Sequence, residues 1–513
     1  MIERSGPSLG DLVAGLSVAL VAIPQSLAYA ELAGMPAEFG LFASAVPSIA
    51  AAFFVSSRQL QTGPVALTAL LTFGALSPLA EPFSTEYIGL AALLALLVGG
   101  MRVLLGVLRA GRVAYVLSEP VLLGFTTAAA ILITASQLPR VFDAEPGDGG
   151  VLANAFWAVV RIDQWRATAV VFSITVALII LLGRRVHSVF PGVLVAVIVA
   201  LFVSWIAGYD GSVVGELSGS FVTPQLSFPW SATGSLLVPA VAISLVGFAE
   251  PSSIARTFAA QDRTVWSANK EFVSQGVANL AAGLSGAFPV GGSFSRSSLN
   301  RVAGATSRWA GAITGLTVFL FIPFTPVLER LPGAVLGTVV VVAVAKLIRI
   351  PELIKLTRQS TVQAVVAWGT LVATLAASPR VEQGVLVGVG LALIAHLYRE
   401  LWITVPTEVI DEVLVIRPQG VLWFATVPAL DAELRRLIAL HPDVGAVDFD
   451  LGAVGRLDFS GAAALARIVA ELADDGIPTG FSNVPPACQR SVDNHLSGNT
   501  LPPRADTGFG DRR

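Results

Sequence analysis

The sequence predicts an α-helical membrane protein with many spans, followed by a small α/β domain outside the bilayer. Hydrophobic residues make up 54% of the 513 residues and charged residues only 13%, whereas soluble domains contain about 25% charged residues. Apolar runs long enough to cross a bilayer, about 17–25 residues, recur until roughly residue 400. Beyond that point short apolar runs alternate with amphipathic stretches, which is typical of α/β domains.

The apolar runs predict fourteen spans within a transmembrane domain of residues 1–400. The runs at Val65 and Phe294 are too short to cross the bilayer as complete helices. The expected spans begin near Asp11, Ala37, Val65, Tyr87, Ser118, Thr168, Phe190, Ser235, Asn269, Phe294, Ser307, Gly333, Thr361 and Glu382.

Basic residues predict the orientation of these spans, because loops on the cytoplasmic side are enriched in Lys and Arg. With a cytoplasmic N-terminus, the outside loops contain only Arg140, Arg161, Arg166, Arg330 and Arg380. We therefore expect a multi-pass protein of the cell inner membrane or plasma membrane, with a cytoplasmic C-terminal domain. The net charge of −3 gives no reason to expect a nucleic-acid partner. The inside loops contain Arg58, Arg102, Arg109, Arg112, Arg184, Arg185, Arg256, Arg263, Lys270, Arg301, Arg308, Lys346, Arg349, Lys355 and Arg358.

Helix-breaking residues suggest two related halves, residues 1–225 and 226–400. Pro64 follows Pro24 of span 1 by 40 residues, and Gly291 follows Pro251 of span 8 by the same interval. Because seven spans separate the halves, the two repeats must be inverted relative to each other. Inverted repeats with paired breaks place a substrate site where the broken elements meet. The alternative is that Pro and Gly interrupt these spans without a functional role.

Two ionisable residues lie at membrane depth beside these breaks. Arg296 follows a Pro-Val-Gly-Gly segment, and burying an arginine there costs about 2.5–3.5 kcal/mol on insertion scales. A guanidinium next to the positive end of a half-helix predicts an anion site. Glu250, in span 8, would pair with a cation or take up a proton. It either forms a structural ion pair with Arg296 or couples proton binding to anion binding.

The C-terminal region predicts an α/β domain of residues 406–494. Glu412–Ile416 and Val421–Phe424 are expected to form a β-hairpin, and Val447–Leu451 a buried strand. Helices are expected around Leu430–Ile438 and over Phe459–Leu472. Residues 495–513 are expected to be a disordered tail. Neither a metal-ligand cluster nor a nucleophile–base pair is evident, so we expect no cofactor, no metal and no enzymatic activity.

Several segments resemble one family of membrane proteins, in order and over essentially the whole chain. The chain resembles the sulfate permease (SulP) transporters, relatives of the mammalian solute carriers that include prestin. Its Asp458-Phe459-Ser460-Gly461 segment resembles the Asp-x-[Ser/Thr]-Gly loop of STAS domains. The other matching segments are Pro24-Gln25-Ser26-Leu27-Ala28-Tyr29-Ala30, Phe39-Gly40-Leu41-Phe42, Gly63-Pro64-Val65-Ala66, Gly247-Phe248-Ala249-Glu250 and Ser293-Phe294-Ser295-Arg296-Ser297.

The resemblance implies a 7+7 inverted-repeat fold with two half-helix breaks, a cytoplasmic STAS domain and a homodimer. Spans 1–4 and 8–11 would form a core domain, and spans 5–7 and 12–14 a gate domain. The anion would lie between the N-termini of spans 3 and 10, lined by spans 1 and 8. The substrate-binding residues that this implies are Gln25, Tyr29, Val65, Ala66, Glu250, Phe294, Ser295 and Arg296. For Gln25 and Tyr29, interhelical packing with a polar tip is the alternative.

Two positions depart from the family pattern. Glu38 stands where an apolar residue usually precedes Phe-Gly-Leu, so it is a second candidate coupling residue or an interfacial carboxylate in water. Phe459 stands where phosphorylated bacterial STAS proteins have a serine, so we expect this domain to be structural or to bind a partner.

The expected function is secondary active transport of small anions of the sulfate, bicarbonate or dicarboxylate class, coupled to protons. Chloride or anion exchange and sodium-coupled symport are alternatives. A nucleobase permease is disfavoured by the arginine, because a neutral base requires amide and carboxylate partners. A membrane-anchored STAS signalling protein is disfavoured by helix breaks in both repeats.

Overall fold

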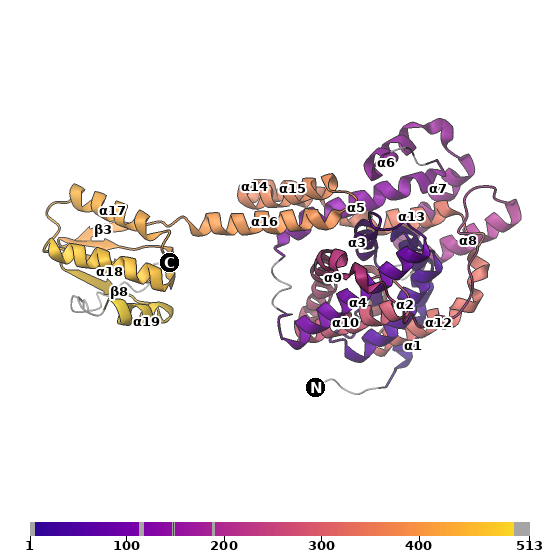
Figure 1. The fold of residues 1–513 in the computed structure, drawn as a ribbon, viewed down its shortest axis with the longest axis horizontal. Helices are drawn as coiled ribbons and strands as arrows, with labels where there is room; N and C mark the ends of the chain where they lie inside the picture. Colours follow the sequence, from indigo (N-terminus) through magenta and orange to yellow (C-terminus); the bar gives the residue numbers. More distant parts are fainter. Residues whose placement is uncertain (1–5, 112–116, 146, 148, 187–189, 497–513) are drawn as a thin grey trace. The chain divides into compact units, whose positions relative to one another are not determined.

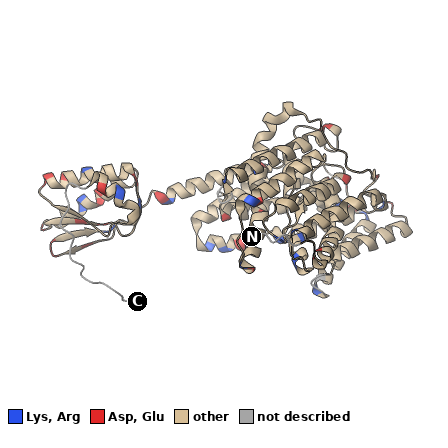
Figure 2. Cartoon of the chain, turned by 90° about the horizontal axis from the view of Figure 1, so that it is seen from below, with Lys and Arg blue, Asp and Glu red and all other residues tan. Residues whose placement is uncertain are grey.

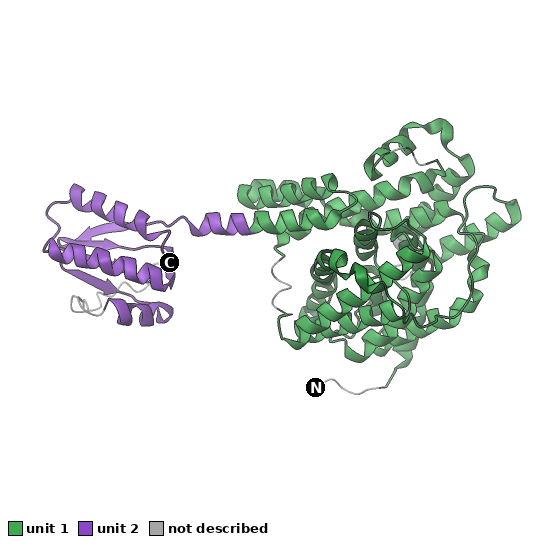
Figure 3. Ribbon diagram, viewed as in Figure 1, with its two compact units in different colours: residues 1–392 green, residues 393–513 purple. Residues whose placement is uncertain are grey.

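The computed structural model describes residues 6–111, 117–145, 147, 149–186 and 190–496. The chain forms two compact units, residues 1–392 and 393–513, which divide within helix α16 (Figure 3). Arg112 and most of the predicted tail, residues 497–513, lie outside the described residues. Charged residues are sparse along the helices of the first unit (Figure 2).

The first unit consists almost entirely of helices (Figure 1). Fourteen of these helices begin within two residues of the predicted span starts, because the thickness of the bilayer dictates their length. They are α1 (Leu9–Leu32), α2 (Glu38–Phe54), α3 (Ala66–Leu76), α4 (Thr85–Val107), α5 (Glu119–Phe142), α7 (Ala167–Val186), α8 (Gly192–Ala207), α9 (Thr233–Gln261), α10 (Ala268–Leu284), α11 (Phe294–Val302), α12 (Trp309–Phe321), α13 (Gly333–Val344), α15 (Thr361–Ala376) and α16 (Val381–Glu400).

Seven helical segments of the described chain are long and apolar enough to cross a membrane by length and composition. As predicted, α3 and α11 are much shorter, at 11 and 9 residues. Two further helices were not predicted, α6 (Val151–Val160) and the amphipathic α14 (Ile350–Gln359). Short 3₁₀ segments occur at Ile162–Gln164, Trp230–Ala232, Ile322–Leu328 and Ala345–Leu347.

The helices pack in two groups that correspond to the expected core and gate. In the core group, α10 packs against α4 and α2, and α12 packs against α1 and α2. In the gate group, α5 packs against α13 and α15, while α7 packs against α8. Helices α4 and α10 approach each other most closely where both carry glycine. A Cβ on Gly99 would lie only 2.9 Å from the Gly276 carbonyl oxygen, so the two backbones are in direct contact there.

The two predicted helix breaks meet at the centre of the core group. Strands β1 (Thr62–Gly63) and β2 (Gly291–Gly292) pair antiparallel, with Gly63 opposite Gly291. Helix α3 begins three residues after β1, and α11 begins two residues after β2. The antiparallel pairing is the arrangement expected of two repeats inverted relative to each other.

The second unit is an α/β domain whose sheet has the strand order β3-β4-β6-β8. Its core includes Leu414, Phe449 and Leu465, all buried. The predicted helices and the buried strand are confirmed. Its elements are β3 (Thr407–Ile410), β4 (Val413–Ile416), β5 (Gly420–Leu422), α17 (Val427–Leu440), β6 (Ala446–Asp450), β7 (Val454–Leu457), α18 (Phe459–Asp474), β8 (Thr479–Ser482) and α19 (Pro486–His495).

The predicted hairpin between Glu412–Ile416 and Val421–Phe424 was wrong, because these two strands do not pair with each other. Strand β4 forms its hairpin with the preceding strand β3, whereas β5 pairs parallel with β7 in a separate two-stranded sheet. Asp411 and Glu412 both have positive φ, 49° and 63°, as the tight turns that favour hairpins require. Asp411 tolerates this backbone conformation, but Glu412 is not a typical turn residue, so the dipeptide was a weak hairpin signal.

Candidate functional site

Arg296 lies in the first turn of α11, and its residue is only 2% exposed. Its Nη2 donates a hydrogen bond to the carbonyl oxygen of Pro64, 2.7 Å away across the β1–β2 crossing. A Cβ on Gly63 would lie 3.1 Å from Nη1, so the absence of a side chain there admits the guanidinium. The Arg296 Nε is buried and forms no hydrogen bond within the described chain. The guanidinium therefore retains donor capacity for a ligand.

Glu250 lies just before Pro251 in α9 and is half-buried. Its Oε1 accepts a hydrogen bond from the backbone N–H of Phe294, 3.0 Å away, at the first residue of α11. The Glu250 carboxylate and the Arg296 guanidinium are more than 4 Å apart, so these two described residues do not form an ion pair. Their charges still interact electrostatically. The carboxylate therefore accepts from a helix-terminal amide, and helix N-termini of this kind attract negative charge.

The N-termini of the two half-helices differ. In α11, Ser293 is the N-cap and its Oγ accepts from the Arg296 N–H at 3.5 Å. In α3, the N-cap is Val65, whose backbone is extended and whose side chain cannot accept a hydrogen bond. Both Val65 and Ala66 are buried. The first amides of α3 thus lack a side-chain cap, which leaves them available to an anion.

Helix α1 adds two buried polar side chains, one turn apart. Tyr29 is close enough to Arg296 and Glu250 to interact electrostatically with both. The Oε1 of Gln25 is buried without a hydrogen-bond partner in the described chain. Phe294 and Ser295, the other two expected residues, are exposed, and the Ser295 Oγ lies 3.3 Å from that of Ser293. These contacts bring Tyr29, Glu250, Phe294 and Arg296 together.

Glu38 does not share these contacts. It is half-buried at the first residue of α2, and its Oε2 accepts a hydrogen bond from the Ser218 backbone N–H at 2.9 Å. Ser218 belongs to the long connection between α8 and α9. The carboxylate is thus bonded to a loop, and its proposed coupling role has no support from these contacts.

The assignment of Arg102 to an inside loop was wrong. Arg102 lies within α4 and is fully buried. Its guanidinium donates to three backbone carbonyls, those of Ile243 at 2.9 Å, Val290 at 3.1 Å and Ser244 at 3.2 Å. A Cβ on Gly247 would lie 2.6 Å from its Nη2 and 3.2 Å from the Thr68 methyl group of α3. Arg102 is therefore a second buried positive charge directly behind the breaks.

Sequence reasoning also missed the buried amides that support the crossing. The Gln61 backbone joins β1 to α11, because its N–H donates to the Ser297 Oγ and its carbonyl accepts from the Ser293 N–H. The Gln275 Nε2 donates to the Thr62 Oγ1 at 2.8 Å. Asn279 bonds both the N–H and the carbonyl of Val290. Amides within apolar spans were the available signal, since buried polar groups require partners.

Comparison with known proteins identifies the family of the chain. The Sulfate permease family model matches residues 9–370, and the STAS domain model matches residues 404–496. A probable sulfate transporter of Mycobacterium tuberculosis is 35% identical over 398 residues, covering 76% of this chain and 70% of the relative. The chloroplastic sulfate transporter 4.1 of Arabidopsis thaliana is 29% identical over 515 residues, covering 92% and 75% respectively.

Solved structures support the fold. Murine solute carrier 26 family member A9, in an inward-facing state, aligns with a TM-score of 0.85 at 21% identity, covering 96% of this chain and 88% of that one. The transmembrane domain of a cyanobacterial bicarbonate transporter aligns with a TM-score of 0.63 at 20% identity, covering 75% and 97%. The chain is therefore a multi-pass membrane protein of the sulfate permease family, an anion transporter and not an enzyme, with a C-terminal STAS domain.

Proposed function

We propose that this protein is a secondary active transporter that couples the movement of a small oxyanion to protons. The observation that carries this proposal is the Glu250 carboxylate on the Phe294 amide, beside the buried Arg296 guanidinium. Sulfate is the first substrate to test, because relatives from Mycobacterium tuberculosis and Arabidopsis thaliana are named sulfate transporters. Bicarbonate and small dicarboxylates present similar oxygens to the same donors.

The anion would bind between the two half-helix N-termini. The uncapped amides at Val65 and Ala66 would contribute one set of donors, and the Phe294 amide with Arg296 the other. Gln25 and Tyr29 of α1 would complete the pocket, and Ser295 would add a hydroxyl at its exposed edge. The positive ends of both half-helices favour a negative ligand at this position.

Proton coupling follows from competition for one amide. While it is ionised, Glu250 holds the Phe294 N–H and repels an incoming anion. Protonation removes the charge and weakens the carboxyl as an acceptor, which frees the amide for substrate. By linkage, the bound anion must raise the proton affinity of Glu250 by the same factor. One proton and one anion would then move together.

Transport would require the core group to move against the gate group. Glu31 at the end of α1 forms an ion pair with Arg140 of α5, which joins core to gate. A movement of the two groups must break or re-form this pair. The Arg140 side chain is partly exposed and that of Glu31 is largely buried, so solvent screens this ion pair only in part.

The deciding experiment is uptake of labelled sulfate, bicarbonate or a dicarboxylate into proteoliposomes, with pH and sodium gradients imposed independently. Proton-coupled symport predicts accumulation with an inward proton gradient and no response to sodium. Accumulation with sodium alone would indicate sodium symport. Uptake that requires only a counter-anion inside the vesicles would indicate exchange. The absence of anion flux under every gradient would contradict the proposal.

A further inference from the structure

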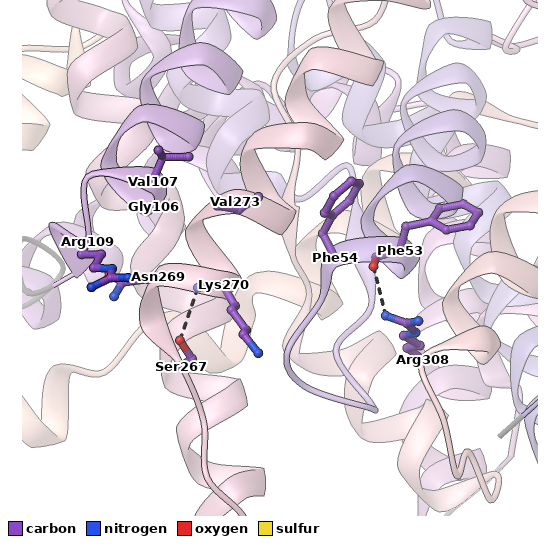
Figure 4. Close-up of a pocket in the computed structure, with 10 residues that line it drawn as sticks. All are labelled: Phe53, Phe54, Gly106, Val107, Arg109, Ser267, Asn269, Lys270, Val273 and Arg308. Carbon is purple, nitrogen blue, oxygen red and sulfur yellow. Dashed lines mark hydrogen bonds between the residues drawn. The ribbon is translucent and has the colours of Figure 1, made fainter. Parts of the chain in front are cut away.

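A basic pocket lies at one end of the core helices (Figure 4). None of its lining residues belongs to the proposed transport site. Its volume is about 490 Å³. It opens where α2 and α4 end and where α10 and α12 begin. The lining residues are Phe53, Phe54, Gly106, Val107, Arg109, Ser267, Asn269, Lys270, Val273 and Arg308.

Three of the lining residues are cations and none is acidic. Arg109, Lys270 and Arg308 form no ion pair with any carboxylate of the described residues, although the Arg308 Nη1 donates to the Phe53 carbonyl at 3.0 Å. The nearest carboxylate in sequence, Glu271, is buried and accepts from the N–H and hydroxyl of Ser56. None of the three cations is therefore directly paired with a carboxylate of the described chain.

The rim of the same pocket is apolar and exposed. Phe53, Phe54 and Val107 are 53%, 49% and 66% exposed. In Figure 4, Lys270 lies between Arg109 on one side and the two phenylalanines on the other. Exposed aromatic and aliphatic side chains at the end of a membrane helix contact the acyl region of lipids. Phe53 also packs edge-to-face against Trp309, with ring centroids 5.8 Å apart. A soluble anion would satisfy the cations and leave the exposed surfaces of Phe54 and Val107 uncovered.

We propose that this pocket binds the phosphate headgroup of an anionic phospholipid, with an acyl chain against Phe53, Phe54 and Val107. The Arg109 and Lys270 side chains would contact the phosphate, and Arg308 would close the opposite side. Basic pockets between membrane helices on the cytoplasmic side are suited to such headgroups. The charge distribution of the sequence assigns this end of the helices to the cytoplasm, where anionic lipids are attractive partners.

The test is native mass spectrometry of the full-length protein, titrated with phosphatidylglycerol and, separately, with phosphatidylcholine. Phosphatidylglycerol should be retained and phosphatidylcholine should not. Lys270→Gln or Arg109→Gln should each weaken phosphatidylglycerol retention about fivefold, from about 1 kcal/mol per basic residue near an anionic surface. The matched control is Lys355→Gln, an exposed lysine of α14 outside the pocket, which should leave retention unchanged.

Three outcomes would overturn the proposal. Equal losses in Lys270→Gln and Lys355→Gln would mean that general surface charge, not this pocket, holds the lipid. Equal retention of phosphatidylcholine would remove the role of the headgroup charge. Displacement of bound phosphatidylglycerol by an equal concentration of inorganic phosphate would identify a soluble-anion site instead. Unchanged thermal unfolding of each variant ensures that a weaker lipid signal does not reflect misfolding.

Discussion

Replacing Glu250 with glutamine removes one negative charge from the centre of the core and retains almost the same shape. In the wild-type protein the ionised Oε1 accepts from the Phe294 N–H at 3.0 Å, in the position where an anion would take that amide. Substrate must displace the carboxylate before it can use the N-terminus of α11. In the Glu250→Gln variant, it displaces only a neutral amide oxygen.

The expected gain in anion affinity can be worked from this hydrogen bond. Bonds to charged groups contribute about 1.5–3 kcal/mol, and neutral ones about 0.5–1.5 kcal/mol. When substrate displaces residue 250 from the Phe294 amide, the variant therefore loses about 1–1.5 kcal/mol less hydrogen-bond free energy than the wild-type protein. This difference corresponds to about 5- to 12-fold tighter anion binding. Loss of the repulsion between the carboxylate and the anion acts in the same direction, so this figure is a lower bound.

The pH dependence has a definite sign. In the wild-type protein, anion affinity should rise as pH falls, because the protonated carboxyl no longer competes for the Phe294 amide. Above the pH at which Glu250 ionises, this gain should be lost. The variant resembles the protonated state at every pH, so its affinity should be high and independent of pH.

The assay combines equilibrium binding of labelled sulfate over a pH series with flux into proteoliposomes. Glu250→Gln should exchange internal for external sulfate but fail to accumulate it with an inward proton gradient. Glu38→Gln is the matched control, because it removes a carboxylate that is bonded to Ser218 and lies outside these contacts. Full proton-driven accumulation by Glu250→Gln would refute its role in coupling. Weaker anion binding by that variant would refute the competition.

Arg296→Ala should lose anion binding, because the guanidinium that would contact the substrate is removed. The variant should still fold, since the cost of burying that charge disappears as well. Sulfate uptake by the purified variant at the wild-type rate would contradict this prediction. Arg102→Lys should lower stability by about 1–3 kcal/mol, because the single nitrogen of lysine cannot replace the three guanidinium nitrogens that each bond a different carbonyl; thermal unfolding in detergent measures this loss. Glu31→Gln should change the rate of sulfate exchange but not the binding affinity, because the pair with Arg140 joins core to gate; an altered affinity with an unchanged rate would argue against that role. Deleting the chain from Pro406 onward should leave measurable flux, since every proposed binding residue precedes it, and complete loss in a folded truncation would show that the STAS domain is required.

Three features of this protein were predictable from the sequence because each depends on local chemistry. The positions of the fourteen long or broken helices follow from apolar run length, which the bilayer dictates. The helix breaks at Pro64 and Gly291 follow from residues that cannot sustain regular helix, and their equal spacing from Pro24 and Pro251 predicted that they would meet. Arg296 was identified as a candidate site residue because a charge at membrane depth is costly and is rarely present without a role.

Only the tertiary structure decided which groups satisfy one another. Arg102 looked like a loop residue because it lies near the end of an apolar run, yet α4 continues and its guanidinium bonds carbonyls of α9 and Val290. Glu250 had two possible partners in the sequence, and packing brought it to the Phe294 amide. The basic pocket likewise brings together Arg109 after the end of α4, Lys270 in the first turn of α10, and Arg308 just before α12. Hydrophobic periodicity fixes where a helix begins and ends, whereas hydrogen-bond partners depend on how helices distant in sequence pack.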